Sequence, residues 1–380
     1  MSTTPSVRAR AVAAVIAYLV ISGCTGGSGT PYPGSANGSS CPEAFGAAKT
    51  AVTRVAANGE RWVGPSSGPR AATGKTVVYI AQTLTNPGVV GVAKGAMEAA
   101  GAIGWNLRII DGEGTPGGVQ VAVNQALGLK PDGIIVGGFS PGLAARQIRQ
   151  ANEAGIPVVG WHAVAAAGPS DRPRLFTNVT TKVEDVAKIS AQWIISASGG
   201  SAGVVVFTDS SIPFAENKSQ LIKNALSACR GIRVLSTEDI PVSESSDRTP
   251  QRVSALIDRF GDSWTYSVAI NDLYFADAAG ALHEAGKDGA SAPFNIGAGD
   301  GDPVAFQRIR DRQYQTATVP EPLLEQGWQI IDELNRAFAG RPASRYVDPI
   351  HLTTTANVDN ATYWEPNNGY REHYTRIWGR

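Results

Sequence analysis

Short apolar runs alternate with longer amphipathic segments along the chain from Lys75 onward. The apolar runs are four or five residues long and favour buried β-strands, while the segments between them have helical periodicity. Strands are predicted at 76–80, 107–110, 133–136, 156–159, 203–207, 232–235, 266–270 and 294–297, with helices at 89–102, 119–129, 143–154, 213–229, 250–260, 275–285 and 303–310. Such alternation indicates parallel sheets with helices on both faces. We therefore predict an α/β fold of two doubly wound parallel-sheet lobes.

The N-terminus has a different pattern. Two arginines precede an apolar segment at 11–21, and Cys24 follows a Ser-Gly pair. A basic stretch, a short apolar core and small residues before a cleavage site are typical of a secretory signal, and this core is too short to span a bilayer. Because the cysteine resembles that of a bacterial lipobox, we predict a lipoprotein signal peptide at 1–23, lipidation at Cys24 and a flexible tether at 24–42. The working domain is then extracytoplasmic and lipid-anchored to the cell membrane; the alternative is an ordinary secreted protein that is cut nearby.

Composition excludes some partners and leaves the other cysteines open. The 380 residues are 43% hydrophobic with a formal net charge of zero, which suits one or two packed domains and shows no bias toward nucleic acid. Outside the cell Cys41 and Cys229 can form a disulfide, but their separation in sequence fixes no geometry, and each is equally a candidate for a free buried thiol. No Cys/His group has zinc spacing, and the acidic run at 299–302 lacks further calcium ligands. We predict no metal and no cofactor.

One motif raises the question of catalysis. Gly138-Phe139-Ser140-Pro141-Gly142 has the Gly-x-Ser-x-Gly spacing of a hydrolase nucleophile elbow, between a predicted strand and a predicted helix. In such an elbow the residue after the serine supplies a backbone N–H to the oxyanion hole, and Pro141 has none. We therefore predict that Ser140 caps the helix that begins at Pro141, and that the protein is not an enzyme.

Three longer segments resemble a known family. They are "KTVVYIAQTLTNPGVVGVAKGAMEAAGAIGWNLRIID", "PDGIIVGGFSPGLAARQIRQANEAGIPVVGW" and "AINDLYFADAAGALHEAGK". In this order they resemble the ribose/galactose class of periplasmic (type I) sugar-binding proteins, and the resemblance runs from about Lys75 to Asp348. It implies a Venus-flytrap of two lobes that are joined by a three-strand hinge and close on a ligand. LacI-type regulators share the fold, but they carry a helix-turn-helix where this chain has a signal and a tether.

The resemblance also implies a role and partners. The family captures solutes for ABC importers, so the expected partners are an ABC permease and its ATPase, a small-molecule ligand and, through the lipid, the membrane. A ligand sensor that feeds a membrane receptor uses the same fold and is the alternative function. We expect a monomer.

The same resemblance predicts how the chain divides. The first lobe is expected at 75–178 plus 321–346, and the second at 179–320 plus 347–359, with crossings near 176–179, 318–321 and 345–348. Residues 43–74 form an N-terminal extension whose first part, 43–57, is predicted to be a helix. Residues 360–380 form an aromatic and polar C-terminal tail. Both terminal segments are candidates for packing on a lobe.

Candidate ligand contacts follow by matching positions. The resemblance implies contacts from residues at strand ends, in binding loops and at the hinge, and the predicted set is Gln82, Asn86, Phe139, Trp161, His162, Asn217, Asn271, Asp300 and Glu321. Four of these have structural alternatives: Asn86 shaping a turn before Pro87, Asp300 capping a helix at Pro303, Trp161 packing at the hinge, and Phe139 packing in the core.

Departures from the family narrow the ligand. His162 and Ala163 stand where the pentose and hexose binders carry an Asp-Arg pair, and the arginine expected on a second-lobe helix falls at Asn217, with Lys218 adjacent. Two carboxylates without a matching arginine disfavour an anion. We predict a neutral polyhydroxylated ligand, a monosaccharide or sugar alcohol; a nucleoside, an amine-bearing molecule or an aromatic molecule is the alternative.

Overall fold

The computed structural model describes residues 40–57 and 61–380. Cys24, the predicted signal peptide and most of the predicted tether lie outside these residues. Within the described part of the chain, no helix combines the length and the apolar character needed to cross a membrane.

The first lobe contains a six-stranded sheet. Its strands are β1 (Thr76–Ala81), β2 (Asn106–Asp111), β3 (Gly133–Gly137), β4 (Val158–Trp161), β5 (Gly168–Asp171) and β6 (Arg174–Val179), in the order β2-β1-β3-β4-β6-β5. All neighbours are parallel except the β5–β6 pair. The helices of this lobe are α2 (Pro87–Ala102), α3 (Pro116–Gly128), the 3-10 helix η1 (Pro141–Ala144), α4 (Ala145–Glu153) and α10 (Leu323–Phe338). β3 and β4 are buried along their whole length, as expected for strands covered on both faces.

The second lobe repeats this architecture. Its strands are β7 (Ala202–Thr208), β8 (Ile232–Asp239), β9 (Tyr266–Ala269), β10 (Phe294–Gly297), β11 (Ala317–Thr318) and β12 (Thr353–Thr354), in the order β12-β11-β10-β9-β7-β8, with only β12 antiparallel to its neighbour. Its helices are α5 (Val183–Ala197), α6 (Pro213–Leu226), η2 (Val242–Glu244), α7 (Ser245–Phe260), η3 (Gly261–Ser263), α8 (Leu273–Glu284) and α9 (Pro303–Asp311). The predicted fold class is thus confirmed, and all eight predicted strands form.

The chain passes between the lobes at three places in this core. After β6 it enters the second lobe, where Ile194 of α5 lies in the apolar core. Between β11 and α10 it returns, because Leu323 and Ile330 of α10 lie in the core of the first lobe. Between α10 and β12 it crosses again.

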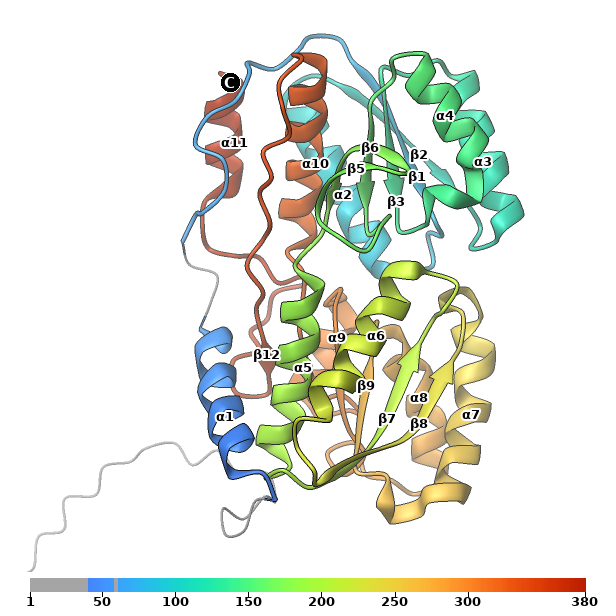
Figure 1. Ribbon diagram of the computed structural model, residues 1–380, viewed down its shortest axis with the longest axis vertical. Helices are drawn as coiled ribbons and strands as arrows, with labels where there is room; N and C mark the ends of the chain where they lie inside the picture. Colours follow the sequence, from blue (N-terminus) through green and yellow to red (C-terminus); the bar gives the residue numbers. More distant parts are fainter. Residues whose placement is uncertain (1–39, 58–60) are drawn as a thin grey trace, which may run out of the picture. The chain divides into compact units, whose positions relative to one another are not determined.

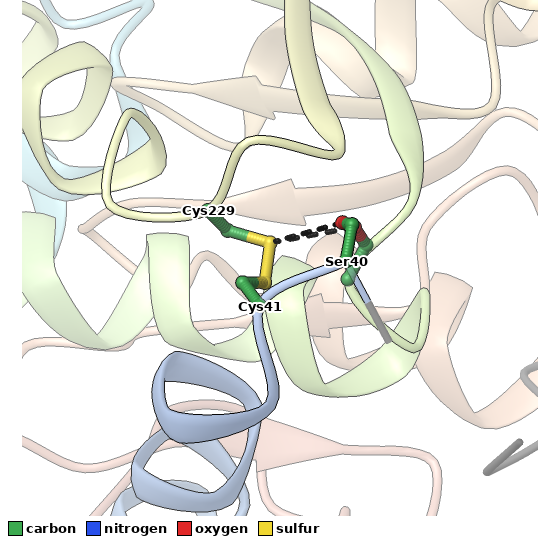
Figure 2. The surroundings of a disulfide bond; sticks show 4 residues. Ser40, Cys41 and Cys229 are labelled. Atoms are coloured by element: carbon green, nitrogen blue, oxygen red, sulfur yellow. Dashed lines mark hydrogen bonds between the residues drawn. A yellow bond between two sulfur atoms is a disulfide. The ribbon is translucent and has the colours of Figure 1, made fainter. Parts of the chain in front are cut away.

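The N-terminal extension begins on the second lobe. Helix α1 (Pro42–Ala56) buries Ala48, Ala51 and Val55 in the same core as α5, and Figure 1 shows the two helices alongside each other. The question that the sequence left open is settled by a disulfide between Cys41 and Cys229, whose Cα atoms are 5.3 Å apart (Figure 2). This bond fixes the start of α1 to the loop that follows α6.

The C-terminal tail ends on the first lobe. Helix α11 (Tyr370–Trp378) lies beside α10 (Figure 1). Trp378 stacks on Trp328 of α10 with ring centroids 5.4 Å apart. The Trp378 indole Nε1 also donates a hydrogen bond of 2.8 Å to Asp332 Oδ1. Stacking and a buried hydrogen bond together hold the tail on α10.

Candidate functional site

Loops that follow parallel strands of both lobes enclose one small buried cavity. Its lining residues are Asn86, Gly138, Trp161 and His162 from the first lobe and Ile212, Phe214, Ala215, Lys218, Val242, Ile270, Asn271 and Asp300 from the second. The cavity measures about 30 Å³, room for about one or two water molecules. Polar side chains beyond the carboxyl ends of strands are where doubly wound sheets bind their ligands.

Three of the predicted residues meet at this cavity from opposite lobes. Asn271 Nδ2 lies 3.4 Å from Asn86 Oδ1 and donates a short hydrogen bond to Asp300 Oδ2. Asn86 also caps α2, since its Oδ1 accepts from Gly88 N at 2.9 Å. Both interpretations of Asn86 therefore apply, because it holds the helix and lines the cavity.

Asp300 is not a helix cap. The cap of α9 is Asp302, whose Oδ1 accepts from Ala305 N at 2.8 Å, while Asp300 has a positive φ of 71° that turns the chain at the cavity. Burial raises the pKa of Asp300 to about 8, although the nearby Lys218 ammonium opposes this shift. The Asp300 carboxyl group is therefore mostly protonated at neutral pH and can both donate and accept.

An aromatic stack crosses from one lobe to the other. The His162 ring lies between Trp161, at 3.9 Å between centroids, and Phe214 of α6, at 4.3 Å. Trp161 Nε1 donates to Gln326 Oε1 at 2.7 Å, so this tryptophan both lines the cavity and packs against the start of α10. Burial lowers the pKa of His162, against the opposing effect of Glu321, so burial favours the neutral imidazole.

Glu321 lies behind His162 and is not among the lining residues. Its Oε1 is 3.0 Å from His162 Nε2, and its Oε2 accepts from Gln326 Nε2 at 2.7 Å and from Thr181 N at 3.4 Å. Burial alone would raise the pKa of Glu321, but His162 and Lys218 lower it to about 2. Glu321 is thus an ionised carboxylate that joins two of the interlobe crossings.

Sequence matching missed the cation of the site. Lys218 is 2% exposed, and its Nζ donates to Ala298 O at 2.6 Å and lies 4.9 Å from the centroid of the Phe214 ring. The structure leaves Asn217 half-buried and outside the cavity lining, so the premise that the site lacks a cation is wrong. Helical spacing carries no signal that separates the two residues: Asn217 and Lys218 lie three and four residues after Phe214, and both spacings place a side chain near Phe214 on α6.

Two other predicted contacts do not line the cavity. Phe139 lies in the first-lobe core with Ile80 and Ile148. Gln82 is buried at the end of β1, and its Oε1 has no hydrogen-bond partner among the described residues.

Ser140 is a helix cap, as predicted, because its Oγ accepts from Gly142 N at 3.2 Å at the start of η1. In the two described stretches of chain, no three His, Cys, Asp or Glu side chains gather in a way that could hold a metal ion.

The chain matches a family described as "Periplasmic binding protein domain" over residues 77–342. Among solved structures, an ABC transporter solute binding protein from Agrobacterium vitis bound with alpha-D-tagatopyranose has a TM-score of 0.66 at 17% identity, covering 77% of this chain and 100% of that chain. A glucose-galactose binding protein from Geobacillus stearothermophilus has a TM-score of 0.65 at 17% identity, with coverage of 76% and 99%. The periplasmic binding protein component of an arabinose ABC transporter from a Shewanella species, bound to arabinofuranose, has a TM-score of 0.66 at 15% identity, with coverage of 80% and 95%. No curated protein matches the chain in sequence.

Proposed function

The chain belongs to the periplasmic binding protein domain family, and on that premise we propose that it captures a small neutral polyhydroxylated molecule outside the cytoplasm for ABC-type import. The observation that carries this proposal is the meeting of Asn86, Asn271 and Asp300, from both lobes, at one buried cavity. Two amides and a protonated carboxyl group can donate and accept at once, as neighbouring hydroxyl groups require.

The charges of the site support a neutral ligand. Burial lowers the pKa of Lys218, but the neighbouring Glu321 carboxylate opposes this shift and favours the ammonium form. The charges of Lys218 and the ionised Glu321 then offset each other, and Asp300 carries a proton at neutral pH. An anion would add a second negative charge to a buried site in which Lys218 already balances Glu321, and an uncompensated buried charge is costly. The structural neighbours described with tagatopyranose and arabinofuranose agree with a monosaccharide.

The ligand reaches the site by rotation of the lobes. A monosaccharide is larger than the 30 Å³ cavity, so the lobes must separate for it to enter. We place the hinge at the three crossings near 180–182, 319–322 and 345–352, which shifts the predicted boundaries by only a few residues. Trp161, His162 and Phe214 line the cavity as a stack of aromatic rings, against which the less polar face of a sugar can pack.

A ligand screen tests the proposal. Isothermal titration calorimetry against sugars, sugar alcohols, nucleosides, amino acids and sugar phosphates should give its tightest binding with a neutral sugar or sugar alcohol. Asn271→Ala should weaken that binding by about 1–3 kcal/mol, because it leaves Asp300 without its partner. Asn217→Ala is the matched control, since Asn217 carries the same side chain on α6 but is not among the residues that line the cavity. A phosphate ester as the tightest ligand, or equal effects of the two variants, would overturn the proposal.

Membrane attachment and partners complete the proposed role. The family places the protein outside the cytoplasm, and we propose that Cys24 carries a lipid. We also propose that the protein is a monomer that passes its ligand to an ABC permease with its ATPase, and that it catalyses no reaction. Mass spectrometry of membrane-extracted protein should find a diacylglyceryl group on Cys24, and Cys24→Ser should release the protein. Unchanged membrane retention of that variant would contradict the anchor.

A further inference from the structure

The N-terminal extension contacts both lobes. Its first part, α1, is joined to the second lobe by the disulfide and by its buried apolar face (Figure 2). Its second part, residues 61–72, lies on α10 of the first lobe. There Arg336 Nη2 donates to Ser67 O at 2.7 Å, and Asn335 Nδ2 donates to Pro69 O at 3.0 Å. The extension is therefore a fourth connection between the lobes.

The C-terminal segment makes a fifth connection. Asp359 is held on the second lobe, because its carbonyl oxygen accepts from Arg310 Nη1 of α9 at 2.6 Å. Tyr363 packs in the core cluster of the first lobe, where Lys94 Nζ of α2 lies 5.5 Å from its ring centroid. From there the chain continues into α11.

The two terminal segments are tied to each other at both ends. On the second lobe, Asn357 Nδ2 donates to Ala56 O at the end of α1 at 3.1 Å. On the first lobe, Trp62 stacks on His373 of α11 with centroids 4.9 Å apart and planes 5° apart. We call residues 40–57 and 61–72 together with 355–378 the terminal brace.

The connections within the brace are short. Six Cα–Cα steps join Ala56, whose carbonyl oxygen accepts from Asn357, to Trp62, which stacks on His373, and an extended chain spans at most about 22 Å over that length. Four steps join Asp359 to Tyr363 and span at most about 14 Å. Every orientation of the lobes must keep both pairs of points within these limits. These two limits add to those that the short hinge crossings at 180–182 and 319–322 already impose.

We infer that the terminal brace restricts the range of lobe orientations in the ligand-free protein, with the Cys41–Cys229 disulfide fixing its end on the second lobe. This inference rests on the proposed function in one respect: the motion that the brace restricts is the rotation of the lobes that lets the ligand enter. It assigns a role to both terminal segments, which lie outside the matched family range of 77–342.

Distances between spin labels on the two lobes test the inference. Labels are attached to Arg149→Cys on α4 and Asp258→Cys on α7, two exposed positions, in a Cys24→Ser background that leaves no other free thiol. Pulsed electron paramagnetic resonance of the ligand-free full-length chain should give a narrow distance distribution. Cys41→Ser with Cys229→Ser should broaden it, because α1 is then held by packing alone.

A second variant tests the inference if the protein without the disulfide does not fold. Ten Gly and Ser residues inserted after Asn58 and ten more after Ala361 lengthen both connections while the disulfide and the Trp62 contacts stay in place, and this double insertion should also broaden the distribution. Val205→Ala, which removes buried atoms of the second lobe away from the brace, is the control for general loss of stability and should leave the distribution narrow.

The results separate this inference from the proposed function. An insertion variant with the same distribution as the parent overturns the brace, as does equal broadening by Val205→Ala. Because no ligand is present in these measurements, failure to bind a sugar would overturn the proposed function and leave the distances unaffected.

Discussion

Replacing Asp300 with Asn tests the electrostatics of the site without any knowledge of the ligand. Asn has the shape of Asp, keeps an oxygen that can accept from Asn271, and tolerates the positive φ of 71° at this position. It removes only the ability to ionise. The expected effect is therefore on how stability depends on pH.

The sign follows from the raised pKa. Burial raises the pKa of Asp300 from 3.8 to about 8, against the opposing effect of Lys218 and with smaller contributions from Glu321, Asp272 and Asp302 in the same direction. Between these two values the folded protein holds a proton that the unfolded chain has lost, so the contribution of Asp300 to stability is present at low pH and is lost as pH rises toward about 8. Each pH unit in this window changes the free energy of unfolding by about 1.4 kcal/mol, or about 3 kcal/mol from pH 5 to pH 7.

Urea unfolding at several pH values measures this difference. The stability of Asp300→Asn relative to the parent should increase by a few kcal/mol between about pH 5 and pH 7. Asp258→Asn, at an exposed position on α7, is the matched control and should show a constant difference. A constant difference for Asp300→Asn as well would refute the assignment of a protonated carboxyl group at the cavity.

Three further substitutions test other parts of the molecule. Ser140→Ala should cost about 1 kcal/mol of stability in urea unfolding as a lost helix cap and leave ligand affinity unchanged; a loss of esterase activity in this variant would instead support a nucleophile. Cys41→Ser with Cys229→Ser should lower the free energy of unfolding by about 2–5 kcal/mol under non-reducing conditions, and no loss would mean that the disulfide does not form. Glu321→Gln should cost about 1.5–3 kcal/mol, because it removes the charge that accepts from Gln326, and equal stability at neutral pH would contradict an ionised Glu321.

The core of the fold was predictable because its signal is local. The eight predicted strands are short apolar runs between turn residues, and burial on both faces accounts for the composition of all but the edge strands β2 and β8, which are largely exposed or half-buried. β11 and β12 have two residues each and carry no such run, and β5 has alternating exposed positions. β12 pairs with β11 across more than thirty residues, whereas β5 pairs with the adjacent β6 but lacks an apolar run, so neither signal was visible in the local pattern.

The sequence predicts residues of the candidate site only where they lie at the ends of strands, because the end of a strand is itself the edge of the cleft. Asn86, Trp161, His162, Asn271 and Asp300 follow strands, and all five line the cavity. On a helix, one residue is a rotation of about 100°, so a register error of one position exchanges a lining residue for one that faces elsewhere.

That rotation explains why Asn217 was predicted in place of Lys218, and the exchange changes the charge of the site. With Asn217 in the site, two carboxylates would face the ligand without a cation; with Lys218 there, Glu321 has a counterion and Asp300 is left to be neutralised by a proton. Both arrangements disfavour an anion, but only the second explains how two acidic residues can be almost fully buried together, at 4% and 1% exposure. A buried carboxyl group needs either a partner charge or a proton, and this site supplies one of each. Lys218→Met should therefore raise the pKa of Glu321 and, by removing the charge that opposes protonation of Asp300, raise that pKa further.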